Sequence, residues 1–155
     1  DVYKRQTSLV FVFGAIFLML LLLFKSLLTS LIVLFIPLIA VGFVFSFMSI
    51  FSIPLDIMTI TIASISVGMS VDYAIHIAWR FREEQKISKR DAEINTIHTS
   101  GQAVLITAMT VIIGFLVFVF SNFNPTVLFG LLSALAIFIS AALALRLIPI
   151  FLESK

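Results

Sequence analysis

The chain alternates between long runs of hydrophobic residues and short polar segments. A helix needs about 20 apolar residues to cross a hydrocarbon core of roughly 30 Å, and several of the runs approach or reach this length. The expected spans cover about residues 7–24, 28–50, 57–79, 101–120 and 127–151. The pattern therefore predicts an all-α membrane protein with five transmembrane helices.

Short polar segments separate these spans. Residues 51–56 and 121–125 have the composition of turns, and Asp56 is expected to cap the third helix. Residues 1–6 are polar up to the abrupt start of the first apolar run. We set them aside as the tail of a preceding domain or as a sequencing or cloning scar, so the predicted five-helix domain covers residues 7–155.

The longest polar segment, residues 85–99, separates the third span from the fourth. Residues 88–91 have the Ser-x-x-Asp form of a capping box, and Ile87, Ile94 and Ile97 recur at helical spacing. This combination predicts a short amphipathic helix that lies on the cytoplasmic surface of the membrane. His98 is expected to be a solvated or interfacial side chain there.

The composition supports a membrane protein and excludes several other classes. Hydrophobic residues make up 61% of the chain and charged residues 12%, with a mean hydropathy of +1.22, whereas soluble domains contain about 25% charged residues. The absence of cysteine excludes a disulfide framework and a thiolate metal site within this sequence. A net charge of +2 does not suggest binding to nucleic acid.

Lys and Arg residues collect on one side of the predicted spans. The turns at 51–56 and 121–125 hold neither residue type. The other side carries Lys25, Arg80, Arg82, Lys86, Lys89, Arg90, Arg146 and Lys155. The positive-inside rule predicts that this side is cytoplasmic, with the amino terminus outside and the carboxyl terminus inside. Lys4 and Arg5 fall on the opposite side, a conflict that the scar interpretation would remove.

The third span holds a single carboxylate, Asp72. Insertion scales put the cost of a charged side chain at a helix centre at roughly 2.5 to 3.5 kcal/mol, so packing alone does not explain it. Helical spacing places Asp72 on a face of small and polar residues, formed by Thr61, Gly68, Asp72 and His76. A carboxyl group there can take up a proton and release it when water or a partner arrives. We expect Asp72 to carry protons, with His76 as either an extension of the path or a packing residue.

The fourth span offers a matching face of small and hydroxylated residues. Its members are Ser100, Ala103, Thr107, Thr110 and Gly114. Such residues let membrane helices approach closely and form hydrogen bonds across the contact. We expect spans three and four to pack with Thr107 or Thr110 near Asp72, and Gly68 to permit the approach. Packing without a role in proton transfer is the alternative for the threonines.

The sequence gives no support for an enzyme. An intramembrane aspartyl protease needs two membrane carboxylates, and the spans supply one. Neither a His-Glu-x-x-His zinc motif nor a Gly-x-Ser-x-Gly nucleophile elbow occurs. Without a phosphate-binding loop, an ion gradient is the expected energy source, and no metal or cofactor is expected.

Residues 68–76, GMSVDYAIH, and residues 80–84, RFREE, resemble the Gly-x-x-x-Asp-Tyr segment of the resistance-nodulation-division superfamily. The resemblance is to its branch of exporters of hydrophobic and amphiphilic molecules, which includes the MMPL-type lipid transporters and hopanoid exporters. It covers nearly the whole chain from residue 7, including the surface helix and residues 107–110, 121–123 and 129–132.

In that superfamily, two similar halves each contain a helix, a large extracytoplasmic domain and five further helices. The resemblance implies that this chain is the five-helix part of one half, with the carboxy-terminal half favoured, and that the other half is its partner. It implies proton-driven export of lipids, hopanoid-like or drug-like molecules across a bacterial cytoplasmic membrane. Asp72 matches the relay aspartate, and Tyr73 matches the tyrosine that pairs with the aspartate of the other half. The oligomeric state is left open.

Two other classes share parts of this pattern. An accessory subunit of the Sec preprotein translocase has similar Gly-Met-x-Val-Asp and Arg-Glu-Glu segments, but it normally has Ala-Asn where this chain has Tyr73-Ala74. A sterol-sensing domain shares the helix architecture and would bind lipid without taking up protons. The sequence leaves both alternatives open beside the exporter.

Overall fold

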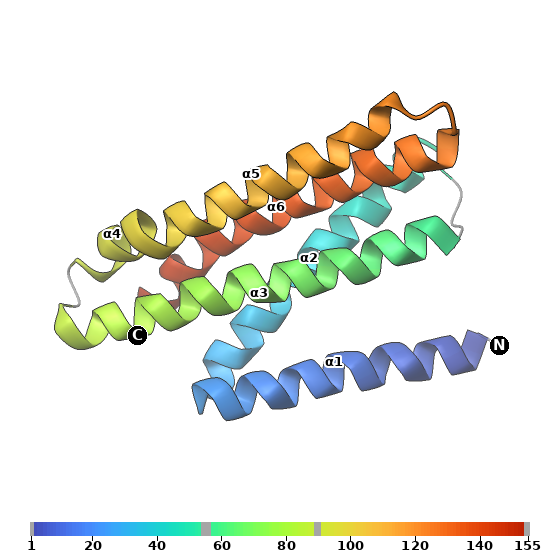
Figure 1. The fold of residues 1–155 in the computed structure, drawn as a ribbon. Helices are drawn as coiled ribbons and strands as arrows, with labels where there is room; N and C mark the ends of the chain where they lie inside the picture. The colour runs from blue at the N-terminus through green and yellow to red at the C-terminus, as the bar shows by residue number, and fades with distance from the viewer. Residues whose placement is uncertain (1, 54–56, 89–90, 154–155) are drawn as a thin grey trace.

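The computed structural model describes residues 2–53, 57–88 and 91–153, and in this part of the chain all regular secondary structure is helical (Figure 1). The five long helices are α1 (Val2–Phe24), α2 (Leu27–Ile50), α3 (Ile57–Ile87), α5 (Gln102–Leu116) and α6 (Asn124–Glu153). The short helix α4 (Ala92–Thr96), a π-helical turn (Ile97–Gly101) and a 3-10 turn (Val117–Phe120) extend α5 at its two ends. The predicted all-α fold is confirmed.

Four helical stretches of the described chain are long and apolar enough to cross a membrane. They are Leu27–Ile50, Thr61–Ile87, Ala92–Phe120 and Asn124–Leu152. The described apolar part of α1, Phe13–Phe24, is shorter. The protein is therefore a multi-pass membrane protein, and the crossing by α1 stays a prediction.

The prediction of a separate surface helix over residues 85–99 is wrong. α3 continues eight residues beyond its predicted end at Trp79, as far as Ile87, and the next helix begins at Ala92 with Asp91 as its N-cap. Helical hydrogen bonding then continues without a break from Ala92 to Phe120. Two membrane helices thus form a hairpin here. The polar residues that were expected to form a separate surface helix instead lengthen these two helices beyond their apolar parts.

The described ends of the helices correct two predictions about caps and turns. Ser88 does not cap a helix; its hydroxyl donates a hydrogen bond to the Asp91 carboxylate at 3.0 Å. Asn124 and Pro125, predicted as part of a turn, form the first turn of α6, where the fixed φ of proline is compatible with a helix. Asp56, the predicted cap of α3, lies outside the described residues, as do Lys89 and Arg90.

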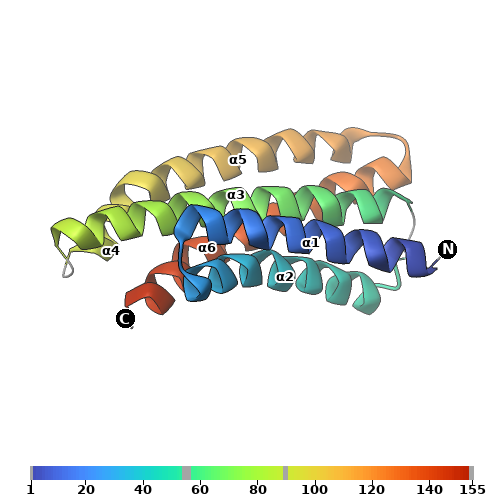
Figure 2. The ribbon, with the colours of Figure 1, turned by 90° about the horizontal axis from the view of Figure 1, so that it is seen from below.

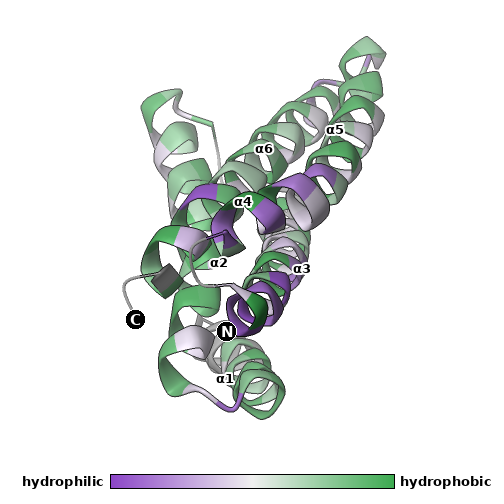
Figure 3. Ribbon diagram, turned by 90° about the vertical axis from the view of Figure 1, so that its left-hand side faces the viewer, coloured by the Kyte–Doolittle hydropathy of each residue, from purple (hydrophilic) through white to green (hydrophobic). Residues whose placement is uncertain are grey.

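The long helices run alternately up and down, so the two predicted sets of turns lie at opposite ends of the bundle (Figures 1 and 2). One end holds the α1–α2 turn, the α3–α4 turn and the carboxyl terminus; the other holds the amino terminus and the α5–α6 turn. Hydrophilic residues gather on α4 and the end of α3 (Figure 3). We call this the cation-rich end because Lys25, Arg80, Arg82 and Lys86 lie there.

Helix α6 is the centre of the bundle, since it packs against α2, α3 and α5. Small side chains make the contacts close: Ala136, Ala144 and Ser140 are fully buried on α6, and Ser140 forms a hydrogen bond with Ser70 of α3. Small residues at helix interfaces let membrane helices approach one another. This packing fixes the positions of α3 and α5 on either side of α6.

At the cation-rich end, polar side chains tie α3 to its neighbours. The Arg82 guanidinium donates a hydrogen bond to the Phe24 carbonyl at the end of α1 and lies over the Phe24 ring. Gln85 donates to the Leu152 carbonyl of α6 at 3.3 Å. The end of α3 is therefore fixed on two sides.

Candidate functional site

The Asp72 carboxylate lies on a face of α3 that no other described helix covers. The side chains of Asp72 and His76 are 65% and 66% exposed in the isolated chain, and Nε2 of His76 lies 3.5 Å from Oδ1 of Asp72. A spacing of four residues brings the two side chains together on one helix face. Gly68 belongs to the same exposed face, and a Cβ at its position would meet open space.

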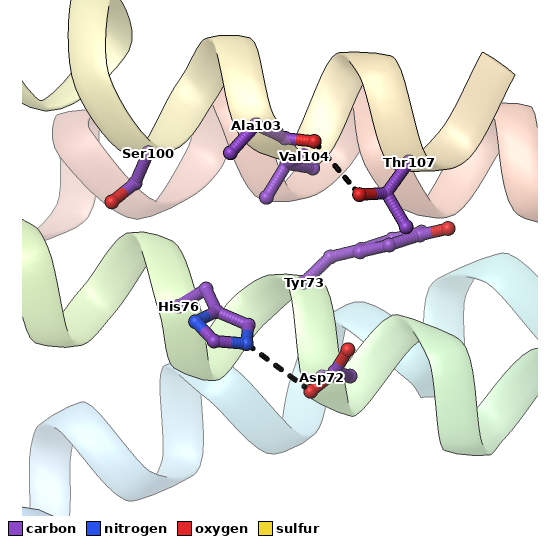
Figure 4. Close-up of a pocket in the computed structure, with 7 residues that line it drawn as sticks. All are labelled: Asp72, Tyr73, His76, Ser100, Ala103, Val104 and Thr107. Carbon is purple, nitrogen blue, oxygen red and sulfur yellow. Dashed lines mark hydrogen bonds and ion pairs between the residues drawn. The ribbon is translucent and has the colours of Figure 1, made fainter. Parts of the chain in front are cut away.

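Tyr73 points in a different direction from Asp72, although the two are adjacent in sequence. Its side chain is 1% exposed and reaches from α3 toward α5 (Figure 4). Among the described residues, its hydroxyl group has no hydrogen-bond partner. Buried hydroxyl groups are normally hydrogen-bonded, so this group is an unusual feature of the site.

A pocket of about 270 Å³ lies between α3 and α5 at the level of Asp72 (Figure 4). It is lined by Asp72, Tyr73 and His76 of α3, by Ser100 of the π-helical turn, and by Ala103, Val104 and Thr107 of α5. The structure thus brings together three side chains singled out on α3 with three members of the matching face.

The two candidate threonines differ in position. Thr107 lines the pocket and donates a hydrogen bond to the Ala103 carbonyl at 2.9 Å. Thr110 donates to the Ile106 carbonyl at 2.8 Å and is not among the residues that line the pocket. Of the two threonines expected near Asp72, only Thr107 faces it across the pocket, while α5 packs mainly on α6. The roles of Gly68, Thr107 and Thr110 stay predictions.

A second polar cluster follows the pocket at the end of α3. Arg80 pairs with the buried carboxylate of Glu84 at 2.6 Å, and the Asn95 amide donates a hydrogen bond to the same carboxylate at 3.1 Å. Sequence reasoning missed this cluster. Its signal was the constant spacing of four residues from Asp72 through His76 and Arg80 to Glu84, which forms one polar line along α3.

The site residues do not form a metal centre in the part of the chain that the structure describes, since no three His, Asp or Glu side chains converge there. The arrangement instead offers an ionisable pair, Asp72 and His76, beside a pocket that Ser100 and Thr107 also line. Groups of this kind can take up, hold and pass on protons.

Comparison with known proteins relates the whole chain to one family. The model of the MMPL family matches residues 2–153. The chain is also similar to a protein of Methanocaldococcus jannaschii that is named only as a membrane protein, MJ1562, with 32% identity over 153 residues. The match covers 96% of this chain and 39% of that protein, so the chain spans about two fifths of the relative's length. No solved structure matches the chain significantly.

Proposed function

Because the chain belongs to the MMPL family, we propose that it is part of a proton-driven secondary transporter that exports hydrophobic or amphiphilic molecules. Lipids, hopanoid-like compounds and drug-like compounds are the substrate classes that the resemblance implies. The family match favours this function over a translocase subunit or a sterol-sensing module. We place the protein in a bacterial cytoplasmic membrane, with the amino terminus outside and the carboxyl terminus in the cytoplasm.

The observation that carries the proposal is the Asp72–His76 pair at the edge of a pocket. The part of α3 before Arg80 holds no other Asp, Glu, Lys, Arg or His. A charged side chain at a helix centre in the membrane costs roughly 2.5 to 3.5 kcal/mol on insertion scales. A change in the charge of this carboxylate during the transport cycle would explain why the helix carries it in spite of that cost. One proton that moves down a potential of 100 mV releases about 2.3 kcal/mol.

In the proposed cycle, Asp72 alternates between a charged form, paired with His76, and a neutral form that carries the proton. Tyr73 and His76 serve as proton-relay groups beside it. The change in charge alters how strongly the exposed face of α3 attracts a partner helix, and the resulting movement drives export. Gly68, Thr107 and Thr110 support the relay by allowing helices to approach.

The exposed face of α3 requires a cover in the membrane, because Asp72 is 65% exposed in this chain alone. We propose that a second five-helix half covers it, supplied by another part of the same protein, with membrane lipids around both. A relative that is longer than this chain agrees with this arrangement, since the chain covers only 39% of that protein.

The test is the substitution Asp72→Asn in the full-length protein, with proton-driven export measured in membrane vesicles. Asparagine has nearly the same shape but cannot carry a proton, so we expect export to be lost while membrane insertion and protein level are unchanged. Asp91→Asn is the matched control, because Asp91 is an exposed N-cap outside the apolar span. Normal proton-driven export by Asp72→Asn would falsify the relay.

A further inference from the structure

The turn between α1 and α2 contains an unusual backbone conformation. Lys25, the residue directly after α1, has a φ angle of 48°, which lies in the left-handed region that favours glycine. Glycine is the usual residue where a helix ends in this conformation. A lysine here costs conformational energy, so its side chain contributes something that glycine cannot, and that is a positive charge at an exposed turn.

Arg82 of α3 brings a second positive charge to the same turn. Its guanidinium donates a hydrogen bond to the carbonyl of Phe24, the residue before Lys25, and lies 5.8 Å from the centre of the Phe24 ring. A guanidinium carries several N–H donors in a rigid fork. The bond to Phe24 therefore fixes the position of the group and leaves other donors for an anion.

These two cations lack the counter-charges that their neighbours have. Of the four cations that define the cation-rich end, Arg80 pairs with Glu84 at 2.6 Å. Lys86 pairs with Glu83 at 2.6 Å. The other two, in and beside the α1–α2 turn, form no ion pair with any residue that the structure describes. Uncompensated positive charge therefore lies at this turn.

The side chains around the turn are those of a lipid-facing surface. Trp79 is 49% exposed, and its ring centre lies 6.4 Å from that of Phe24. Tryptophan side chains gather where the headgroups of the bilayer meet its hydrocarbon core. Exposed leucines flank the turn on both helices: Leu22, Leu23, Leu27 and Leu28. An anion bound at this turn therefore has an apolar surface beside it.

We propose that the α1–α2 turn and α3 form a binding site for an anionic phospholipid. Lys25 and Arg82 bind the phosphate, while Trp79 and the flanking leucines contact the acyl chains. Charge complementarity favours an anionic headgroup over a zwitterionic one, and basic groups between membrane helices bind anionic headgroups in this way. The exposed apolar side chains favour a lipid over a free phosphate ion. This inference goes beyond the proposed function and does not depend on proton transport.

Binding of phosphatidylglycerol to the full-length protein tests the site without measuring transport. The protein is titrated with the lipid in detergent, and bound lipids are counted by native mass spectrometry. We expect Lys25→Gln to weaken binding about fivefold, the effect of one basic residue near an anionic lipid. Lys86→Gln is the matched control, because it removes the same charge from an exposed residue at the same end, where Glu83 already compensates it.

The control should change the affinity for phosphatidylglycerol less than about twofold, because a paired cation attracts an anion weakly. Equal losses for Lys25→Gln and Lys86→Gln would show a general attraction to positive charge and would overturn the site. An unchanged affinity of Lys25→Gln would overturn it as well.

A second variant, Lys25→Gly, separates the charge from the backbone conformation. Glycine adopts a φ angle of 48° without strain, so we expect Lys25→Gly to be as stable as the parent protein in phosphatidylcholine. It should nevertheless lose the increase in unfolding temperature that phosphatidylglycerol gives the parent. An equal increase in the two proteins would contradict a role of the Lys25 charge.

Phosphatidylcholine and inorganic phosphate are the probes that identify the ligand class. Phosphatidylglycerol should bind at least about fivefold more tightly than phosphatidylcholine, because only the first has a net negative charge. Inorganic phosphate should not displace it, since a free ion makes no contact with the exposed apolar side chains. Displacement by inorganic phosphate at the concentration of the lipid would identify a site for a free anion and would overturn the lipid site.

Discussion

Asp72 and Tyr73 show how neighbouring residues of one helix acquire different environments. Successive helical residues are 100° apart, so the carboxylate faces outward while the phenol ring enters the bundle toward α5. The aspartate depends on whatever covers α3, whereas the tyrosine is fixed by its own chain. Substitutions of Tyr73 can therefore remove the hydroxyl group alone or the buried ring as well, and so separate its chemical role from its packing role.

We predict that Tyr73→Phe is folded but impaired in export. Phenylalanine retains the buried ring and removes only the hydroxyl, which has no partner among the described residues. Tyr73→Ala should instead lower protein stability by about 3–5 kcal/mol, because it leaves a cavity in the core. Export in vesicles and thermal unfolding in detergent separate the two effects. Full export activity of Tyr73→Phe would show that the tyrosine has only a packing role.

Among the helices, α5 and α6 make a contact that depends on one glycine. A Cβ at Gly130 would lie 2.5 Å from the Phe115 carbonyl oxygen and 2.8 Å from the Cβ of Phe118. Both neighbouring atoms belong to the backbone or lie next to it, so they cannot move away without a shift of the whole helix. The position of α5, and with it one wall of the pocket, therefore depends on Gly130.

We predict that Gly130→Ala destabilises the protein by about 1–3 kcal/mol, the usual cost of overpacking. Gly42→Ala is the control, because Gly42 also lies inside a long helix but is exposed, with no atom within 4 Å of its added Cβ. Thermal unfolding of the full-length protein in detergent measures both variants. Equal unfolding temperatures for Gly130→Ala and Gly42→Ala would contradict the close contact.

The sequence predicted the helices well because apolar length is a local property. It could not predict that α3 extends to Ile87 and that the next helix begins at Ala92, since the isoleucines at helical spacing fit either a surface helix or two extended membrane helices. It singled out Asp72, His76 and Thr107 from their helix faces, and these three residues line one pocket in the structure. The pocket, the buried hydroxyl of Tyr73 and the Arg80–Glu84–Asn95 cluster depend on how α5 and α4 sit beside α3, which packing on α6 determines.

For the whole molecule, the distribution of charge predicts the orientation in the membrane. Of the described cations, Lys25, Arg80, Arg82 and Lys86 lie at one end, whereas Lys4 and Arg5 lie at the start of α1, at the other end, and the turn before α6 has no Lys or Arg. We therefore predict that a cysteine at exposed Asn122 reacts with an impermeant thiol reagent in intact cells, and that Ile87→Cys reacts only after permeabilisation. Neither substitution removes a positive charge, so the orientation itself should not change.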